Sequence, residues 1–196
     1  MVVRMLILVA AALLLGGCGG KSDGAATTAA ATTTTASTTT STTPEPPLSG
    51  ASTAPAVSKS TSDSVKLLTD VRAASHPGFD RLVFEFQNGV PGYDVRYVQP
   101  PVRADGSGDV VPVVGGAVLV IRMEPALDAD LTQASAPRTY TGPPRFSPPT
   151  SAIAEVVRTG GFEGVLTWAA GLHGKAPFRV TQLRGPARIV IDVDTT

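Results

Sequence analysis

The residues of this chain best suited to chemistry are arginines and aromatic residues, which together can bind carboxylates and sugars. An arginine holds a carboxylate through two parallel hydrogen bonds, and an aromatic ring stacks on a sugar ring. Residues 136–149, a segment with five prolines, carry four such side chains: Arg138, Tyr140, Arg145 and Phe146. Because loops on a rigid scaffold commonly carry binding residues, this segment is a candidate contact surface. The alternative is a covering loop in which Tyr140 and Phe146 plug the end of the fold.

A second polar set comes from two segments that share the pattern Arg, apolar, Val, apolar, acid, apolar and begin at Arg81 and Arg188. On a strand, residues four apart lie on the same face. If the two segments pair as antiparallel strands, Arg81 faces Asp192 and Glu85 faces Arg188. Two interpretations stay open: solvated charges on the outer face of a sheet, or a polar row that contributes to a ligand surface.

Trp168 is the only tryptophan, and two roles are open for it. Its alternation with Leu166 and Ala170 favours a place in the core. An exposed Trp168 would instead offer a platform for a sugar ring. We therefore keep Trp168 among the candidate binding residues, with the core as the alternative.

The sequence contains few residues arranged for catalysis. The only histidines, His76 and His173, are flanked by turn residues, and no His-Glu-x-x-His or Gly-x-Ser-x-Gly motif is present. Glycan hydrolysis needs two facing acids, and the sequence does not show that Glu85 and Glu163 come together. We expect no catalytic residues, no metal ligands and no cofactor.

The first 18 residues have the layout of a lipoprotein signal. Arg4 precedes an uncharged apolar run over residues 5–15, and Leu15-Gly16-Gly17-Cys18 follows. The run is too short to span a bilayer, which needs about 20 residues. The layout predicts a signal peptide over 1–17 and a diacylglycerol on Cys18 that anchors the protein to the outer face of the cell membrane. The alternative is an ordinary signal peptide with an incidental cysteine.

Charge and cysteine content limit the partners. The chain has 16 basic and 16 acidic residues, so it lacks the basic balance of a nucleic-acid-binding protein, and we expect no nucleic-acid partner. Cys18 is the only cysteine. Once it is acylated, no thiol remains for a disulfide, a nucleophile or a metal site.

The rest of the chain divides into a tether and a domain. Residues 18–64 are rich in Thr, Ser, Ala and Pro and bury too little apolar surface to offset their ordering entropy, which predicts a disordered spacer, with or without O-glycans. Residues 65–196 predict an all-β sandwich or open barrel of about eight short strands. The clearest runs are 81–86, 93–98, 117–123, 165–170, 178–183 and 188–193. Residues 150–158 favour a short helix and a strand about equally.

Several motifs, taken in order, resemble the AMIN-like (amidase N-terminal-like) domain of actinobacterial lipoproteins. They are GFDRLVFEF from Gly78, PGYDVRYV from Pro91, YTGP from Tyr140, GFEGVLTW from Gly161 and PARIVIDV from Pro186. The resemblance implies a β-sandwich and a targeting module associated with peptidoglycan. No amidase domain follows in this sequence, so we expect any activity to belong to the module itself or to a partner.

Together these features predict a non-catalytic, lipid-anchored module of the cell envelope that binds peptidoglycan or another wall component. One alternative is an assembly factor that recognises an envelope protein through a sheet edge or the proline-rich segment. Another is a carrier of a small apolar ligand, which would need a large apolar cavity.

Overall fold

The computed structural model describes residues 48–196, and these residues form strands, turns and loops without a helix. Eight strands of seven to eleven residues form the body, and five strands of two or three residues accompany them. The predicted all-β sandwich is therefore confirmed, and the helix considered for residues 150–158 was wrong. Residues 48–196 include no helix of the length and hydropathy that crossing a bilayer requires. The predicted signal peptide, Cys18 and residues 18–47 of the predicted tether lie outside the described residues.

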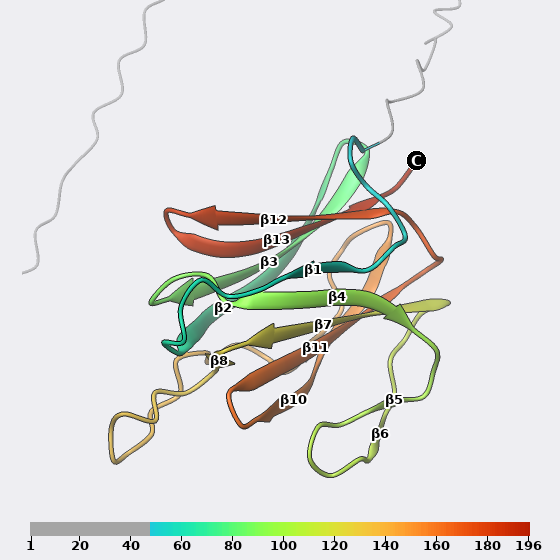
Figure 1. Cartoon of the computed structure of the whole chain (residues 1–196). Helices are drawn as coiled ribbons and strands as arrows, with labels where there is room; N and C mark the ends of the chain where they lie inside the picture. Colours follow the sequence, from blue (N-terminus) through green and yellow to red (C-terminus); the bar gives the residue numbers. More distant parts are fainter. Residues whose placement is uncertain (1–47) are drawn as a thin grey trace, which may run out of the picture. The chain divides into compact units, whose positions relative to one another are not determined.

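The strands form two main sheets and one small one (Figure 1). The six-stranded sheet has the order β1 (Ala56–Ser58), β4 (Gly92–Val98), β7 (Ala117–Glu124), β11 (Val165–Leu172), β10 (Ile153–Phe162) and β9 (Arg145–Phe146). The five-stranded sheet has the order β12 (Phe178–Arg184), β13 (Ala187–Asp194), β3 (Phe79–Gln87), β2 (Lys66–His76) and β8 (Ala126–Leu127). The small sheet pairs β5 (Val102–Arg103) with β6 (Val110–Val111).

The core lies between the inner faces of the two main sheets. In β3, Leu82, Phe84 and Phe86 point inward and are at most 4% exposed, as the alternation of this segment predicts. Phe84 meets Trp168 of β11 edge to face, with ring centroids 5.9 Å apart. A single hydrophobic cluster from both sheets fills this space. The packing gives the strands a rigid base on which their outward side chains are held.

Residues 48–58, which we call the strap, are bound to both sheets. The backbone N–H of Leu48 donates to Asp194 Oδ2 at 3.2 Å, and Ser52 exchanges two backbone hydrogen bonds with Phe178 of β12. Strand β1 then pairs with β4. Figure 1 shows the strap starting beside the C-terminus. Residues 48–58, which the sequence analysis assigned to the tether, are thus bound to the sandwich through backbone hydrogen bonds although they have few apolar side chains to bury.

Residues 99–116, the flap, cover part of the outer face of the six-stranded sheet. Val102 of the flap packs on Val118, Val157 and Ala169 in a second, smaller hydrophobic cluster. The flap approaches β11 so closely that a Cβ on Gly171 would lie 1.9 Å from the carbonyl oxygen of Val114. This face of the six-stranded sheet is consequently buried where the flap lies, whereas the outer face of the five-stranded sheet has no equivalent cover among the described residues.

Candidate binding surface: the arginine face

The outer face of the five-stranded sheet carries a row of charged side chains. Because Leu82, Phe84 and Ile191 point into the core, their neighbours along β3 and β13 point outward. Strand register then places the charges of four strands side by side. We call this set the arginine face: Arg72, Arg81, Arg179 and Arg188 with Asp70, Glu85 and Asp192.

Asp192 lies at one end of the arginine face and is 1% exposed. It accepts hydrogen bonds from Arg81 Nε at 2.7 Å, from Arg81 Nη2 at 3.0 Å and from Arg179 Nη2 at 2.7 Å. Burial alone would raise the pKa of the Asp192 carboxyl, but the bonds from the two arginines outweigh burial and lower it. Asp192 therefore stays ionised and fixes two guanidinium groups in place.

The predicted pairing of the two similar strands is confirmed, and its ion pairs are confirmed in part. Arg81 lies opposite Asp192, and Glu85 lies opposite Arg188. Glu85 nevertheless forms its ion pair with Arg72 of β2, at 3.1 Å. Asp70 also lies opposite Glu85, and Arg72 binds both carboxylates. Two facing acids thus attract the arginine that neutralises both, which explains why Glu85 does not pair with Arg188.

Arg188 is the member of the arginine face whose charge is least satisfied. Its Nε donates to the Pro186 carbonyl at 3.4 Å, and it has no carboxylate partner among the described residues. Arg72 is 44% exposed in addition to binding Asp70 and Glu85. The arginine face as defined has four arginines and three carboxylates, and Asp194, two residues beyond Asp192 on β13, lies next to it. The face can accept further anionic or hydroxyl groups through the outward N–H groups of Arg72 and Arg188.

The segment 136–149 covers the sandwich. Tyr140 is 4% exposed, donates to the Pro143 carbonyl at 2.8 Å and contacts Trp168 edge to face. Phe146 lies in β9 and packs against the core. The segment is thus a covering loop rather than an exposed contact surface at Tyr140. The Tyr140 ring is enclosed and cannot stack on a sugar ring.

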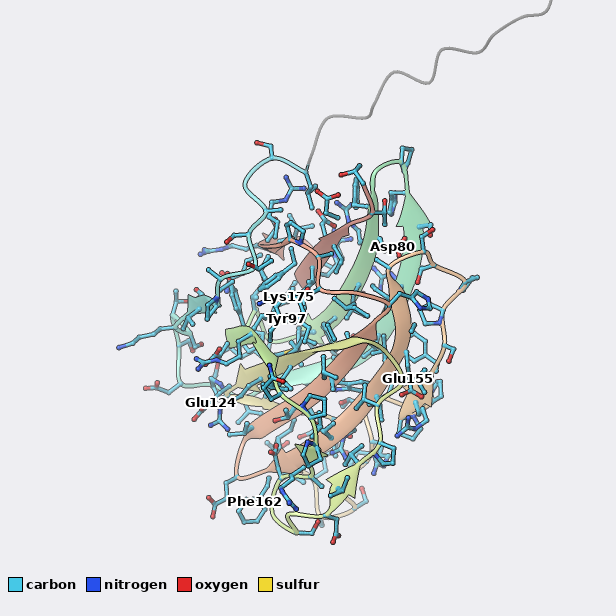
Figure 2. All side chains as sticks on the ribbon, turned by 90° about the vertical axis from the view of Figure 1, so that its right-hand side faces the viewer. Asp80, Tyr97, Glu124, Glu155, Phe162 and Lys175 are labelled. Carbon is cyan, nitrogen blue, oxygen red and sulfur yellow. The ribbon has the colours of Figure 1, made fainter. Side chains whose placement is uncertain are left out.

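The two arginines of the covering segment are held by acids. Arg138 Nη1 lies 2.9 Å from Asp128 Oδ2, and Arg145 Nη1 lies 2.5 Å from Glu155 Oε1. Figure 2 shows Glu155 at the side of the molecule, far from Phe162. Both acids are buried, so these pairs fasten the segment to the sheets, although the side chains of Arg138 and Arg145 stay partly exposed.

Trp168 lies in the core, as its alternation with Leu166 and Ala170 favours. It is 0% exposed and packs between Phe84 and Tyr140. A side chain in this position cannot stack on a sugar. The candidates predicted from the sequence therefore divide into three places: Arg81, Glu85 and Arg188 on the arginine face, the covering segment, and Trp168 inside.

The motifs singled out in the sequence lie within this sandwich. A comparison with family models shows which family they belong to. The family model of the AMIN-like domain matches residues 66–195. The chain belongs to the AMIN-like domain family. The match begins at the first residue of β2, so the strap precedes it. No curated protein and no solved structure matches the chain significantly.

Three members of the arginine face in this AMIN-like domain were missed by sequence reasoning: Arg179 on β12, and Asp70 and Arg72 on β2. Arg179 follows Phe178, a core residue, so the alternation of β12 could have placed Arg179 outside. No alternation in the sequence indicated that Arg72 points outward. A register shift between Leu68 and Asp70 interrupts β2, so its inward residues do not alternate regularly.

The histidines and acids considered for catalysis in the sequence do not come together within residues 48–196. The described residues contain no group of three His, Cys, Asp or Glu able to hold a metal ion. His76 is exposed and stacks on Phe79 at 5.0 Å, and His173 is exposed before Gly174. Glu85 lies on β3 and Glu163 at the β10–β11 turn, so the two acids belong to different sheets.

Proposed function

We propose that this chain is a non-catalytic, lipid-anchored module of the cell envelope that binds peptidoglycan through its arginine face. The family match over residues 66–195 carries the proposal, because AMIN-like domains are associated with modules that bind the cell wall. The arginine face supplies the chemistry. Peptidoglycan combines sugar hydroxyls with peptide carboxylates, and arginine N–H groups bind both.

A filled core argues against the carrier alternative. Phe84, Trp168 and Tyr140 contact one another across the interior, and the largest core side chains are less than 2% exposed. An apolar ligand would have to displace these rings. Binding therefore belongs on the surface of the domain.

Binding to purified peptidoglycan tests the proposed function. The full chain should co-sediment with peptidoglycan, and the double variant Arg72→Ser/Arg188→Ser should bind about tenfold or more weakly, since charge-assisted hydrogen bonds of about 1.5–3 kcal/mol each are lost. Arg122→Ser is the matched control: Arg122 is 48% exposed and pairs with Glu124 two residues along its strand, as Arg72 does with Asp70, but on the other sheet. Retention no greater than that of an unrelated β-sandwich, or equal losses in both variants, would refute the proposal.

The anchor is a separate part of the proposal. We place a diacylglycerol on Cys18 and the domain on the outer side of the cell membrane. In cells that process lipoproteins, the chain should incorporate labelled palmitate and fractionate with membranes. Cys18→Ser should abolish the label and release the protein, while Ser49→Cys in that background should not restore it. Membrane retention of unlabelled Cys18→Ser would contradict the anchor.

A further inference from the structure

A second candidate site lies at the end of the sandwich formed by the β12–β13 turn. Here a pocket of about 170 Å³ opens between three connections: the β1–β2 linker, the β3–β4 loop and the β12–β13 turn. The start of the strap contacts the opposite ends of β12 and β13 at Phe178 and Asp194, whereas its last residue, Ser58, directly precedes Lys59 of the pocket lining. The pocket is lined by Lys59, Thr61, Gly89, Val90, Gln182, Arg184 and Ala187.

The pocket lining is basic and contains no carboxylate. Lys59 and Arg184 supply two positive charges, and neither has an ion-pair partner among residues 48–196. Eight other arginines in this part of the chain do pair with acids. Arg184 is thus one of three arginines without an acid partner among residues 48–196, the others being Arg103 on the flap and Arg188 on the arginine face.

A buried lysine and an aspartate lie close to this pocket without lining it. Lys66 is 2% exposed, and its Cε lies beside Gly89, just behind the pocket wall. Its ammonium donates to the carbonyl of Ser62 at 2.7 Å and to that of Ser64, and the charge of Asp63 acts on it as well. The neighbouring hollow that contains Asp63 shares only Lys59 with the pocket.

We propose that this pocket binds a phosphate group. A phosphate presents oxygens in several directions, and the donors here come from separate segments: Lys59 and Thr61 from the linker, Gln182 and Arg184 from β12. Two cations without carboxylate partners offer charge-assisted hydrogen bonds that no group of the domain takes up. The site is distinct from the arginine face, and the proposal does not depend on peptidoglycan binding.

Amide NMR of the full chain during titration with inorganic phosphate tests this site. The Thr61 and Gly89 amides should shift with saturation, and sodium chloride at equal ionic strength should not reproduce the shift. Arg184→Gln should weaken phosphate binding about tenfold, as expected for one lost charge-assisted hydrogen bond. Arg103→Gln is the matched control, because Arg103 is also exposed and lacks an acid partner but lies on the flap.

Two arms distinguish the sources of the phosphate. Glycerophosphoglycerol in solution represents a polymer phosphodiester, and phosphatidylglycerol vesicles, compared with phosphatidylcholine vesicles, represent a lipid headgroup. Stronger binding to either probe that Arg184→Gln weakens identifies the source. No saturable shift with inorganic phosphate, or equal affinity in Arg184→Gln and the wild type, would overturn the proposal whatever the outcome of peptidoglycan sedimentation.

Discussion

Replacing Asp192 by asparagine is expected to lower the free energy of unfolding at neutral pH by about 2–4 kcal/mol. The carboxylate is 1% exposed and accepts three hydrogen bonds from Arg81 and Arg179. An amide cannot accept all three, and it leaves two guanidinium groups without their counter-charge. Urea denaturation of both proteins measures the difference. Glu124→Gln is the control, because Glu124 is 58% exposed in its pair with Arg122, and its loss should cost no more than about 0.5 kcal/mol.

The effect of Asp192→Asn depends on pH in a defined direction. The folded state lowers the pKa of Asp192, so the carboxylate contributes stability above its unfolded pKa of about 3.9 and loses it as pH falls through the lower folded value. The difference between wild type and Asp192→Asn should therefore be full at pH 7 and shrink in acid below about pH 4. A constant difference across this range would show that the ionised carboxylate is not the stabilising group.

Trp168→Ala is expected to lower the free energy of unfolding by about 3–5 kcal/mol, since it leaves a cavity between the sheets where Phe84 and Tyr140 lose their partner. Trp168→Phe should cost much less. It keeps an aromatic ring and removes the buried Nε1 group, which has no hydrogen-bond partner. Thermal and urea unfolding followed by circular dichroism measure both changes.

The same pair of variants separates the core role of Trp168 from a role in binding. Because Trp168 is 0% exposed, folded Trp168→Phe should sediment with peptidoglycan as well as the wild type does. Loss of sedimentation in a Trp168→Phe protein whose unfolding is unchanged would restore the sugar platform as an explanation.

Local alternation made the longest parts of this fold predictable. Strand β3 buries alternate residues between a core and an outer face, and β13 repeats its pattern, so their pairing followed from cross-strand charge. Strand β2 escaped prediction because its bulge breaks the alternation. Glycines weaken a strand, and Gly160 and Gly161 follow one another in the sequence. They nevertheless continue β10, where a Cβ on Gly160 would collide with Asp105 of the flap.

The residues of the candidate site were predictable only where the alternation within one strand determines which way a side chain points. Arg81, Glu85 and Arg188 reach the arginine face through the alternation of their own strands. The ion pair of Arg72 with both Asp70 and Glu85 depends on how β2 lies beside β3. The burial of Tyr140, a loop residue, likewise depends on Trp168, which follows it by 28 residues (168 − 140) and lies on β11. Long-range neighbours of this kind leave no local signal.

The strap also determines how the domain responds to mechanical load. Tension applied through residue 48 first meets the bonds of Leu48 to Asp194 and of Ser49 to Arg179, then those of Ser52 to Phe178. These hydrogen bonds follow one another along the chain. Tension therefore breaks them in sequence rather than all at once. The strands that hold the core bear no force until the hydrogen bonds of the strap have broken. Residues 48–58 therefore detach under tension before the sandwich unfolds.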